Sequence, residues 1–112
     1  MPIYQAPREA FSFVLFDLFD AEALWARFED TAGLDRATAE MIVDEAGKLA
    51  EQCLQPLNQS GDAEGCRLED GVVRTPRGFP EAYRTFAEGG WGGLGGEVEH
   101  GGQGMPKMLT VV

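Results

Sequence analysis

Residues 11–19 restrict the possible folds of this chain more than any other segment. Apolar residues occur there at the i, i+3, i+4, i+7 and i+8 spacing of one helix face: Phe11, Val14, Leu15, Leu18 and Phe19. Phe13 and Phe16 fall on the other side, so the predicted helix is apolar nearly all round. Such a helix needs burial on more than one face. A chain of 112 residues does not easily supply that many neighbours.

Composition indicates a folded, soluble protein. The length fits one ordinary domain, and 44% of the residues are hydrophobic and 25% charged. Nineteen acidic residues against nine basic ones give a net charge of −10, which repels phosphate backbones and anionic membranes. Nucleic acid is therefore not expected as a partner.

The cysteines and the N-terminal residues indicate a cytoplasmic protein. Cys53 and Cys66 belong to no metal-binding or CxxC spacing, so free thiols in a reducing cytoplasm are expected, although the spacing leaves a disulfide open. The chain does not begin with a basic stretch followed by an unbroken apolar run, so no signal peptide is predicted. No run of about 18 apolar residues occurs either, so no membrane span is expected.

Caps and apolar spacing predict two more helices in the first half. Asp20 can cap a helix that carries an apolar stripe and ends at Gly33. That stripe consists of Leu24, Trp25 and Phe28. Asp35 can cap the longest helix, which Pro56 should end within a residue or two. One side of the longest helix carries Ile42, Ala46, Leu49, Ala50, Cys53 and Leu57, and Asp44 and Lys48 can pair on its exposed side.

Turns and a fourth helix are predicted next. Residues 58–65 are rich in turn formers, and Asp70-Gly71 between apolar residues indicates a short β-hairpin or a bare turn. Pro80 suits the first turn of a helix that stops at Gly89-Gly90. The side chains that this helix is expected to bury are Phe79, Tyr83 and Phe86.

Residues 89–104 hold nine of the fifteen glycines and predict a loop pinned by its neighbours. Pro106 then suits the start of a helix, but only a few residues follow it up to Val112. This helix is therefore predicted to be truncated. The predicted fold class is mainly α: an orthogonal helical cluster with one short hairpin or turn.

Three runs, in order, resemble the acyl-CoA dehydrogenase family, in its longer, multi-domain, 3-methylthiopropanoyl-CoA dehydrogenase-like branch. Residues 4–18 look like the N-terminal extension of that branch. Residues 54–79 contain Pro-Leu-Asn, Ser-Gly-Asp, Asp-Gly-Val-Val and Gly-Phe, and residues 82–106 contain Gly-Trp and Gly-Gly-Gln-Gly-x-Pro. His100 stands where an aromatic residue is usual, and residues 97–99 lack a frequent proline. The family's members in this branch are several times longer.

The resemblance implies a truncated N-terminal helical domain. Residues 1–33 would be extension helices, and residues 34–112 an incomplete N-terminal domain packed with them as one unit. The implied reaction is α,β-desaturation of an acyl-CoA thioester with hydride transfer to FAD. The implied base and most flavin contacts belong to a C-terminal helical domain and a middle β domain. No catalytic, cofactor-binding or metal residue is therefore assigned to this chain, which alone is expected to be inactive and free of FAD.

The implied partners are the acyl-CoA substrate and the other domains of a cytoplasmic, homo-oligomeric enzyme. The chain would form one wall of the flavin and acyl pocket.

Two other functions were also considered from the sequence. A free-standing helical module could dock onto a partner protein through its phenylalanine-rich first helix. A small hydrolase or isomerase is remote, because Ser60 lacks a GxSxG context.

Several residues could be assigned catalytic, metal-binding or phosphate-binding roles, but a purely structural role is favoured for each. The glycine run matches no phosphate-binding motif, and His100 beside Glu97 and Glu99 lacks a second histidine for a metal site. Asp17 and Asp20, like the two glutamates, are better explained as caps or solvated charges than as catalytic pairs. Trp91 is expected to anchor the loop. The aromatic residues expected in a core or domain interface are Phe11, Phe13, Phe16, Phe19, Trp25 and Phe28.

Overall fold

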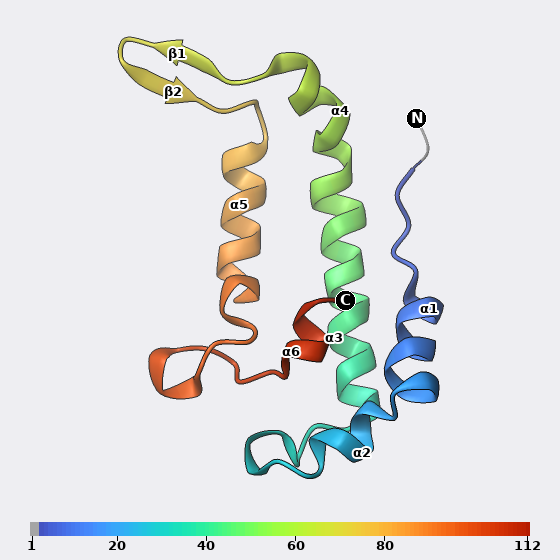
Figure 1. Cartoon of the computed structure of the whole chain (residues 1–112). Helices are drawn as coiled ribbons and strands as arrows, with labels where there is room; N and C mark the ends of the chain where they lie inside the picture. The colour runs from blue at the N-terminus through green and yellow to red at the C-terminus, as the bar shows by residue number, and fades with distance from the viewer. Residues whose placement is uncertain (1–2) are drawn as a thin grey trace.

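The structure, a computed structural model, describes residues 3–112 and is mainly helical with one two-stranded sheet, as predicted (Figure 1). The α-helices are α1 (Arg8–Ser12), α2 (Ala21–Trp25), α3 (Arg36–Leu49), α4 (Gln55–Glu64), α5 (Phe79–Glu88) and α6 (Lys107–Thr110). The strands are β1 (Arg67–Glu69) and β2 (Val72–Arg74), and π-helical turns are η1 (Phe13–Leu18) and η3 (Ala50–Leu54). Short 3-10 turns are η2 (Glu29–Thr31), η4 (Trp91–Gly93) and η5 (Val98–His100).

The predicted first helix forms, but it begins at Arg8 and becomes a π-helix at Phe13. Because π-helical hydrogen bonds join residues i and i+5, the α-helical spacing no longer decides which side chains face the core. Leu15 is buried, whereas Phe13 and Phe19 remain 56% and 57% exposed. Burial of this segment on more than one face is therefore not achieved within the described residues.

Asp20 stands at the N-cap position of α2, but the predicted capping bond is absent from its side chain. Its backbone is left-handed, with φ of 47°, and this conformation turns the chain sharply between η1 and α2. On α2, Trp25 is buried, while Leu24 and Phe28 of the predicted stripe are exposed. The ring of Phe16 packs edge-on against Trp25, with centroids 6.0 Å apart.

A continuous helical rod runs from α3 through η3 into α4, so the prediction that Pro56 ends the helix is wrong (Figure 1). Proline lacks an N–H and clashes with the carbonyl four residues earlier in an α-helix. The π-helical turn η3 lies just before Pro56, and its wider i to i+5 bonding gives the ring room. The turn predicted at residues 58–65 is likewise helical until Gly65.

Two predicted features of α3 are confirmed. The side chain of Asp35 accepts a hydrogen bond from the Thr38 N–H at 2.8 Å and caps the helix. The Lys48 Nζ lies 2.9 Å from Asp44 Oδ2. The apolar side of the rod, from Ile42 to Leu57, is only half-buried.

Arg8 holds the N-terminal segment across α3. Its guanidinium pairs with Asp44 at 2.8 Å and with Glu51 at 2.7 Å, and Glu51 also accepts the Ala6 N–H at 2.8 Å. The guanidinium lies over Gly47, where a Cβ atom would come within 2.6 Å of Arg8 Nη2. Gly47 is therefore the space that lets this side chain cross the helix.

The predicted hairpin forms at the far end of the rod (Figure 1). Asp70 and Gly71 both have positive φ, as a tight two-residue turn between antiparallel strands requires. The turn fixes the register, which places Arg67 opposite Arg74 and Leu68 opposite Val73. All six strand residues are exposed, so the hairpin is an arm that packs on nothing in the described chain.

Helix α5, the glycine-rich loop and α6 follow as predicted, but α5 does not bury its aromatic face. Phe79 and Tyr83 are 39% and 72% exposed, and Phe86 is half-buried. The loop returns the chain to the rod, where Leu109 of α6 joins the core.

The core is small and the molecule is flat. Buried hydrophobic residues in the described chain are Leu15, Ala21, Trp25, Ala39 and Leu109. The radius of gyration is 17.2 Å, against about 13 Å for a compact domain of this length, and the extents are 54 × 36 × 16 Å. No helix within residues 3–112 is long and apolar enough to cross a membrane. Most apolar faces of the helices therefore remain open.

Acid should detach the N-terminal helical segment from α3. The Arg8 guanidinium holds the pKa of Glu51 below its ordinary 4.5, and Lys48, with Arg8 adding to it, holds the pKa of Asp44 below 3.8. Carboxylates with lowered pKa stabilise the fold above their ordinary pKa and lose that effect as pH falls through the folded value. Hydrogen exchange of the α1 and η1 amides should therefore accelerate relative to α5 below about pH 4.

The variant Arg8→Gln is the control for this effect. It should exchange fast in α1 already at pH 7, with little further change in acid. Equal acid sensitivity of α1 in both proteins would show that the ion pairs do not hold the segment.

Candidate functional site: an apolar groove between α4 and α5

An apolar groove of about 850 Å³ lies between α4 and α5. Both helices contribute apolar side chains, because α5 runs back alongside the rod after the hairpin (Figure 1). Its main apolar lining consists of Leu54, Leu57, Pro76, Phe79, Ala82, Tyr83 and Phe86. This volume falls within the range of small-molecule and cofactor sites.

Two glycines let the helices approach at the hairpin end of the groove. The Phe79 ring lies over Gly61, where a Cβ atom would be 2.5 Å from the ring. At Gly78, which has φ of 87°, a Cβ atom would be 2.7 Å from the Leu57 side chain. Away from this contact the aromatic face of α5 lines the groove without filling it.

The groove is lined mainly by apolar side chains and contains few groups that could take part in a reaction. Among its described lining residues the polar side chains are Tyr4, Gln55, Asn58, Asp62, Cys66 and Tyr83, of which Asp62 is the carboxylate. Both thiols are free, and Cys66 in the groove is exposed while Cys53 is half-buried. A charged nucleophile or an acid–base pair is not assembled by these lining residues. The groove can hold an apolar group but supplies no reaction of its own.

Only one wall of this groove is predicted by the sequence. Phe79, Tyr83 and Phe86 predict one aromatic face, whereas residues 58–65, which belong to the opposing helix α4 and its end, are rich in turn formers and predict a turn. The available signal was Pro56, because proline is well tolerated in the first turn of a helix as well as at an end.

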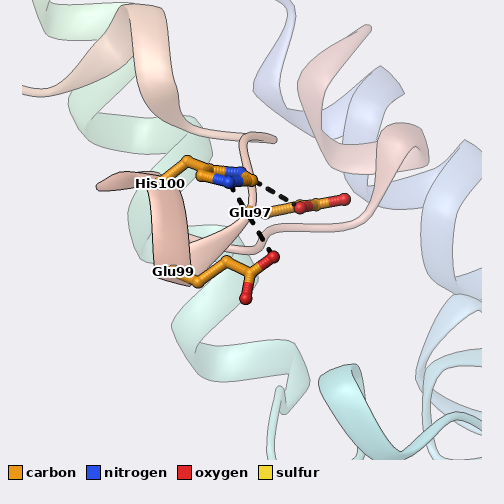
Figure 2. Close-up of side chains that lie close together, drawn as sticks. All are labelled: Glu97, Glu99 and His100. Carbon is orange, nitrogen blue, oxygen red and sulfur yellow. Dashed lines mark ion pairs between the residues drawn. The ribbon is translucent and has the colours of Figure 1, made fainter.

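Glu97, Glu99 and His100 come together at η5, as Figure 2 shows. His100 Nδ1 lies 3.2 Å from Glu97 Oε2, and Nε2 lies 3.9 Å from Glu99 Oε1. The three ligand atoms are within 4.8 Å of one another, a spacing that could hold a metal ion. All three side chains are more than 70% exposed, so the cluster resembles solvated charges more than a built site.

The glycine-rich loop uses its backbone groups internally. Gly93 O accepts from the Gly96 and Gln103 N–H groups, and the Gly104 N–H donates to Gly96 O at 2.8 Å. The side chain of Gln103 donates to Gly90 O at 3.1 Å. These bonds agree with the predicted structural loop rather than with a phosphate cradle. Trp91 is half-buried with its ring over Gly89, as expected of a loop anchor.

The other candidate site residues of the sequence analysis do not line the groove. Asp17 and Asp20 are exposed near η1, and the Ser60 hydroxyl lies 3.5 Å from the Leu57 carbonyl on the surface of α4. The predicted aromatic set is divided. Trp25 is core, Phe11 and Phe16 are half-buried, and Phe13, Phe19 and Phe28 form exposed surface.

A methyl group at Gly102 should break the loop. A Cβ atom there would collide with the backbone of Gly96, which cannot rotate away as a side chain can. We expect Gly102→Ala to lower the free energy of unfolding by about 1–3 kcal/mol, measured by denaturant unfolding. In Gly92→Ala, the matched control, the new atom meets only Phe86 at an ordinary 3.7 Å. Equal stability of the two variants would contradict the internal packing of the loop.

A charge in the groove should abolish its affinity for apolar molecules. Leu54 lines the groove and is 44% exposed, so Leu54→Glu places a carboxylate there without filling a core. We expect binding of a neutral apolar dye to fall strongly. Met41→Glu adds the same charge at a 60% exposed position on α3 outside the groove and should leave binding intact. Equal losses in both variants would mean that the dye binds elsewhere.

The chain was compared with known proteins. No protein-family model matches the chain. It is 38% identical over 109 residues to 3-methylmercaptopropionyl-CoA dehydrogenase of Ruegeria pomeroyi (strain ATCC 700808 / DSM 15171 / DSS-3). The match covers 95% of this chain but only 18% of the relative, so the chain spans about a fifth of that protein's length. The resemblance predicted from the sequence motifs is thereby confirmed: over nearly its whole length, this chain is similar to part of an acyl-CoA dehydrogenase.

Proposed function

We propose that this chain is the helical N-terminal portion of a flavin-dependent acyl-CoA dehydrogenase and is not catalytic alone. The main support for this proposal is the 38% identity to a much longer dehydrogenase. The match covers 95% of this chain and 18% of that dehydrogenase. The reaction of the whole enzyme would remove a proton from the α carbon of an acyl-CoA thioester and transfer a hydride from the β carbon to FAD.

The described residues do not fit FAD itself. Several N–H groups of the glycine-rich loop donate to carbonyls of the same loop, and the groove is lined by a carboxylate but by no arginine or lysine that could bind the diphosphate. The other domains of the enzyme would therefore hold the flavin. No chemical step is assigned to residues of this chain.

The groove between α4 and α5 supports a role in shaping the acyl and flavin pocket. Its lining is apolar and its volume suits a small ligand, as expected for one wall of a site that binds an acyl chain. The open side of the groove would face the rest of the enzyme. In this proposal residues 34–112 form the helical domain, and residues 1–33 form an extension held on it by Arg8.

The exposed apolar surface supports packing against further domains. Phe13, Phe19 and Phe28 each leave more than half of their surface open. Apolar patches of this kind usually mark an interface. We further propose a cytoplasmic, homo-oligomeric enzyme acting on acyl-CoA. The two free thiols agree with a reducing compartment.

The experiment is a paired assay of this chain and of a longer reading frame that contains it. We expect the longer protein to absorb visible light as a flavoprotein and to reduce a dye with acyl-CoA, while the 112-residue chain is colourless and inert. Leu54→Glu in the longer protein should lower acyl-CoA turnover more than Met41→Glu does. Flavin bound by the short chain alone would overturn the proposal.

A second candidate is a free-standing helical module that docks onto a partner protein. The same exposed phenylalanines on the N-terminal segment favour it. The paired assay separates the two functions, because the module predicts that no longer frame exists.

A further inference from the structure

The groove between α4 and α5 receives one side chain from the start of the chain. Residues 3–7, which we call the strap, run without regular secondary structure beside the rod, on its other side from α5 (Figure 1). Among the described lining residues of the groove, Tyr4 alone comes from this segment. Tyr4 is 46% exposed, so about half of its surface is covered. The groove therefore has a third side, formed by a residue far from α4 and α5 in the sequence.

One carboxylate holds the strap on the rod. Glu51 accepts the Ala6 N–H at 2.8 Å and two guanidinium nitrogens of Arg8, at 2.7 and 3.2 Å. A paired contact of this kind fixes the orientation of the arginine as well as its distance. The Glu51 side chain is 24% exposed, so solvent screens these bonds less than it screens a pair on the open surface.

Gly47 lets the strap lie close to α3. A Cβ atom at this position would come within 3.0 Å of the Ala6 Cβ and 2.6 Å of Arg8 Nη2. The missing side chain thus makes room for two residues of the N-terminal segment at once. Together with Glu51, Gly47 fixes both the direction and the height of the strap above the rod.

This anchor determines where Tyr4 lies. Tyr4 is two residues before Ala6, and two residues span at most about 7 Å. Leu54, which also lines the groove, lies one helical turn beyond Glu51. Ile3, on the far side of Tyr4, is 78% exposed and adds little to the placement. The position of the Tyr4 ring at the groove therefore follows from the bonds at Glu51.

We propose that Tyr4 is a specificity-determining residue of the groove, and that Glu51 and Arg8 are positioning residues that act through it. Helices α4 and α5 form two sides of the groove, and the Tyr4 ring adds a third. Dispersion attraction is lost across even a small gap, so a slim apolar chain gains from contact with a third side. A broad apolar group needs the space that the ring occupies. The groove should therefore prefer straight apolar chains over bulky ones.

The strap would then give the N-terminal segment a part in ligand selection as well as in packing. That the natural occupant is an acyl chain rests on the proposed function. The closure of the groove by Tyr4 rests on the contacts of the strap alone, and it can be tested on this chain without flavin or acyl-CoA.

The test compares two uncharged eight-carbon alcohols, 1-octanol as the slim probe and cyclooctanol as the bulky one. Nuclear magnetic resonance titration of the 112-residue chain gives the dissociation constant of each alcohol, and the ratio of the two constants measures the selectivity. We expect Tyr4→Ala to weaken 1-octanol binding about fivefold, because about half of an aromatic side chain's contact is lost. Cyclooctanol binding should stay the same or improve. Tyr4→Phe keeps the ring and should keep the native ratio.

The positioning role is tested by Glu51→Gln, which should shift the ratio in the same direction as Tyr4→Ala. The double variant Y4A/E51Q should shift it no further than Tyr4→Ala alone, because residues that act through one another are not additive. Glu45→Gln is the matched control: it breaks an exposed pair with Lys48 on α3 and should leave the ratio unchanged.

Circular dichroism should show the same helix content in every variant. A native chain that binds both alcohols equally, or neither, would overturn the proposal. So would Tyr4→Ala with an unchanged ratio, or a double variant that adds the two single shifts. None of these results depends on whether a longer reading frame is a dehydrogenase, and an inactive longer protein would leave the selectivity measurement standing.

Discussion

The unbroken helical rod from Arg36 to Glu64 is the constraint on which the other elements depend. It exists because the chain passes Pro56 through the π-helical turn η3 instead of ending there. One side of the rod receives the N-terminal segment through Arg8 across Gly47, and the far end receives α5 through Phe79 on Gly61. A helix ended at Pro56 would provide neither the second wall of the groove nor the base of the hairpin.

Both attachments to the rod are narrow, and this explains the flat shape. The Arg8 guanidinium over Gly47 attaches the N-terminal segment, and the Phe79 ring over Gly61 attaches α5. Neither contact buries much apolar surface. Hydrophobic burial is the main favourable term in folding, and residues 3–112 obtain little of it because only five of their hydrophobic side chains are buried. The chain is similar to about a fifth of a longer dehydrogenase, and in the proposed function the surfaces left open here would face the other domains.

The sequence predicted local elements where a single residue type decides the backbone. Asp35 as a cap, Asp70-Gly71 as a hairpin turn and Pro80 in a first turn are such cases. It failed where a tertiary or non-α feature intervened. The sequence predicts a helix end at Pro56 because the π-helical turn has no clear sequence signal. It predicts burial of Phe79 and Tyr83 because helical spacing shows a face but not what covers it. The groove depends on both of these features, and Pro56, which suits a helix start as well as a helix end, does not by itself decide between them.

Residues 3–112 have an open arrangement in which apolar faces remain exposed and available for contact with other protein domains. Small-angle X-ray scattering of the dilute chain tests this open arrangement most directly. The account predicts a radius of gyration near the 17.2 Å of the structure. A value of about 13 Å, as for a compact domain of 112 residues, would show that the faces close on one another and would contradict the account.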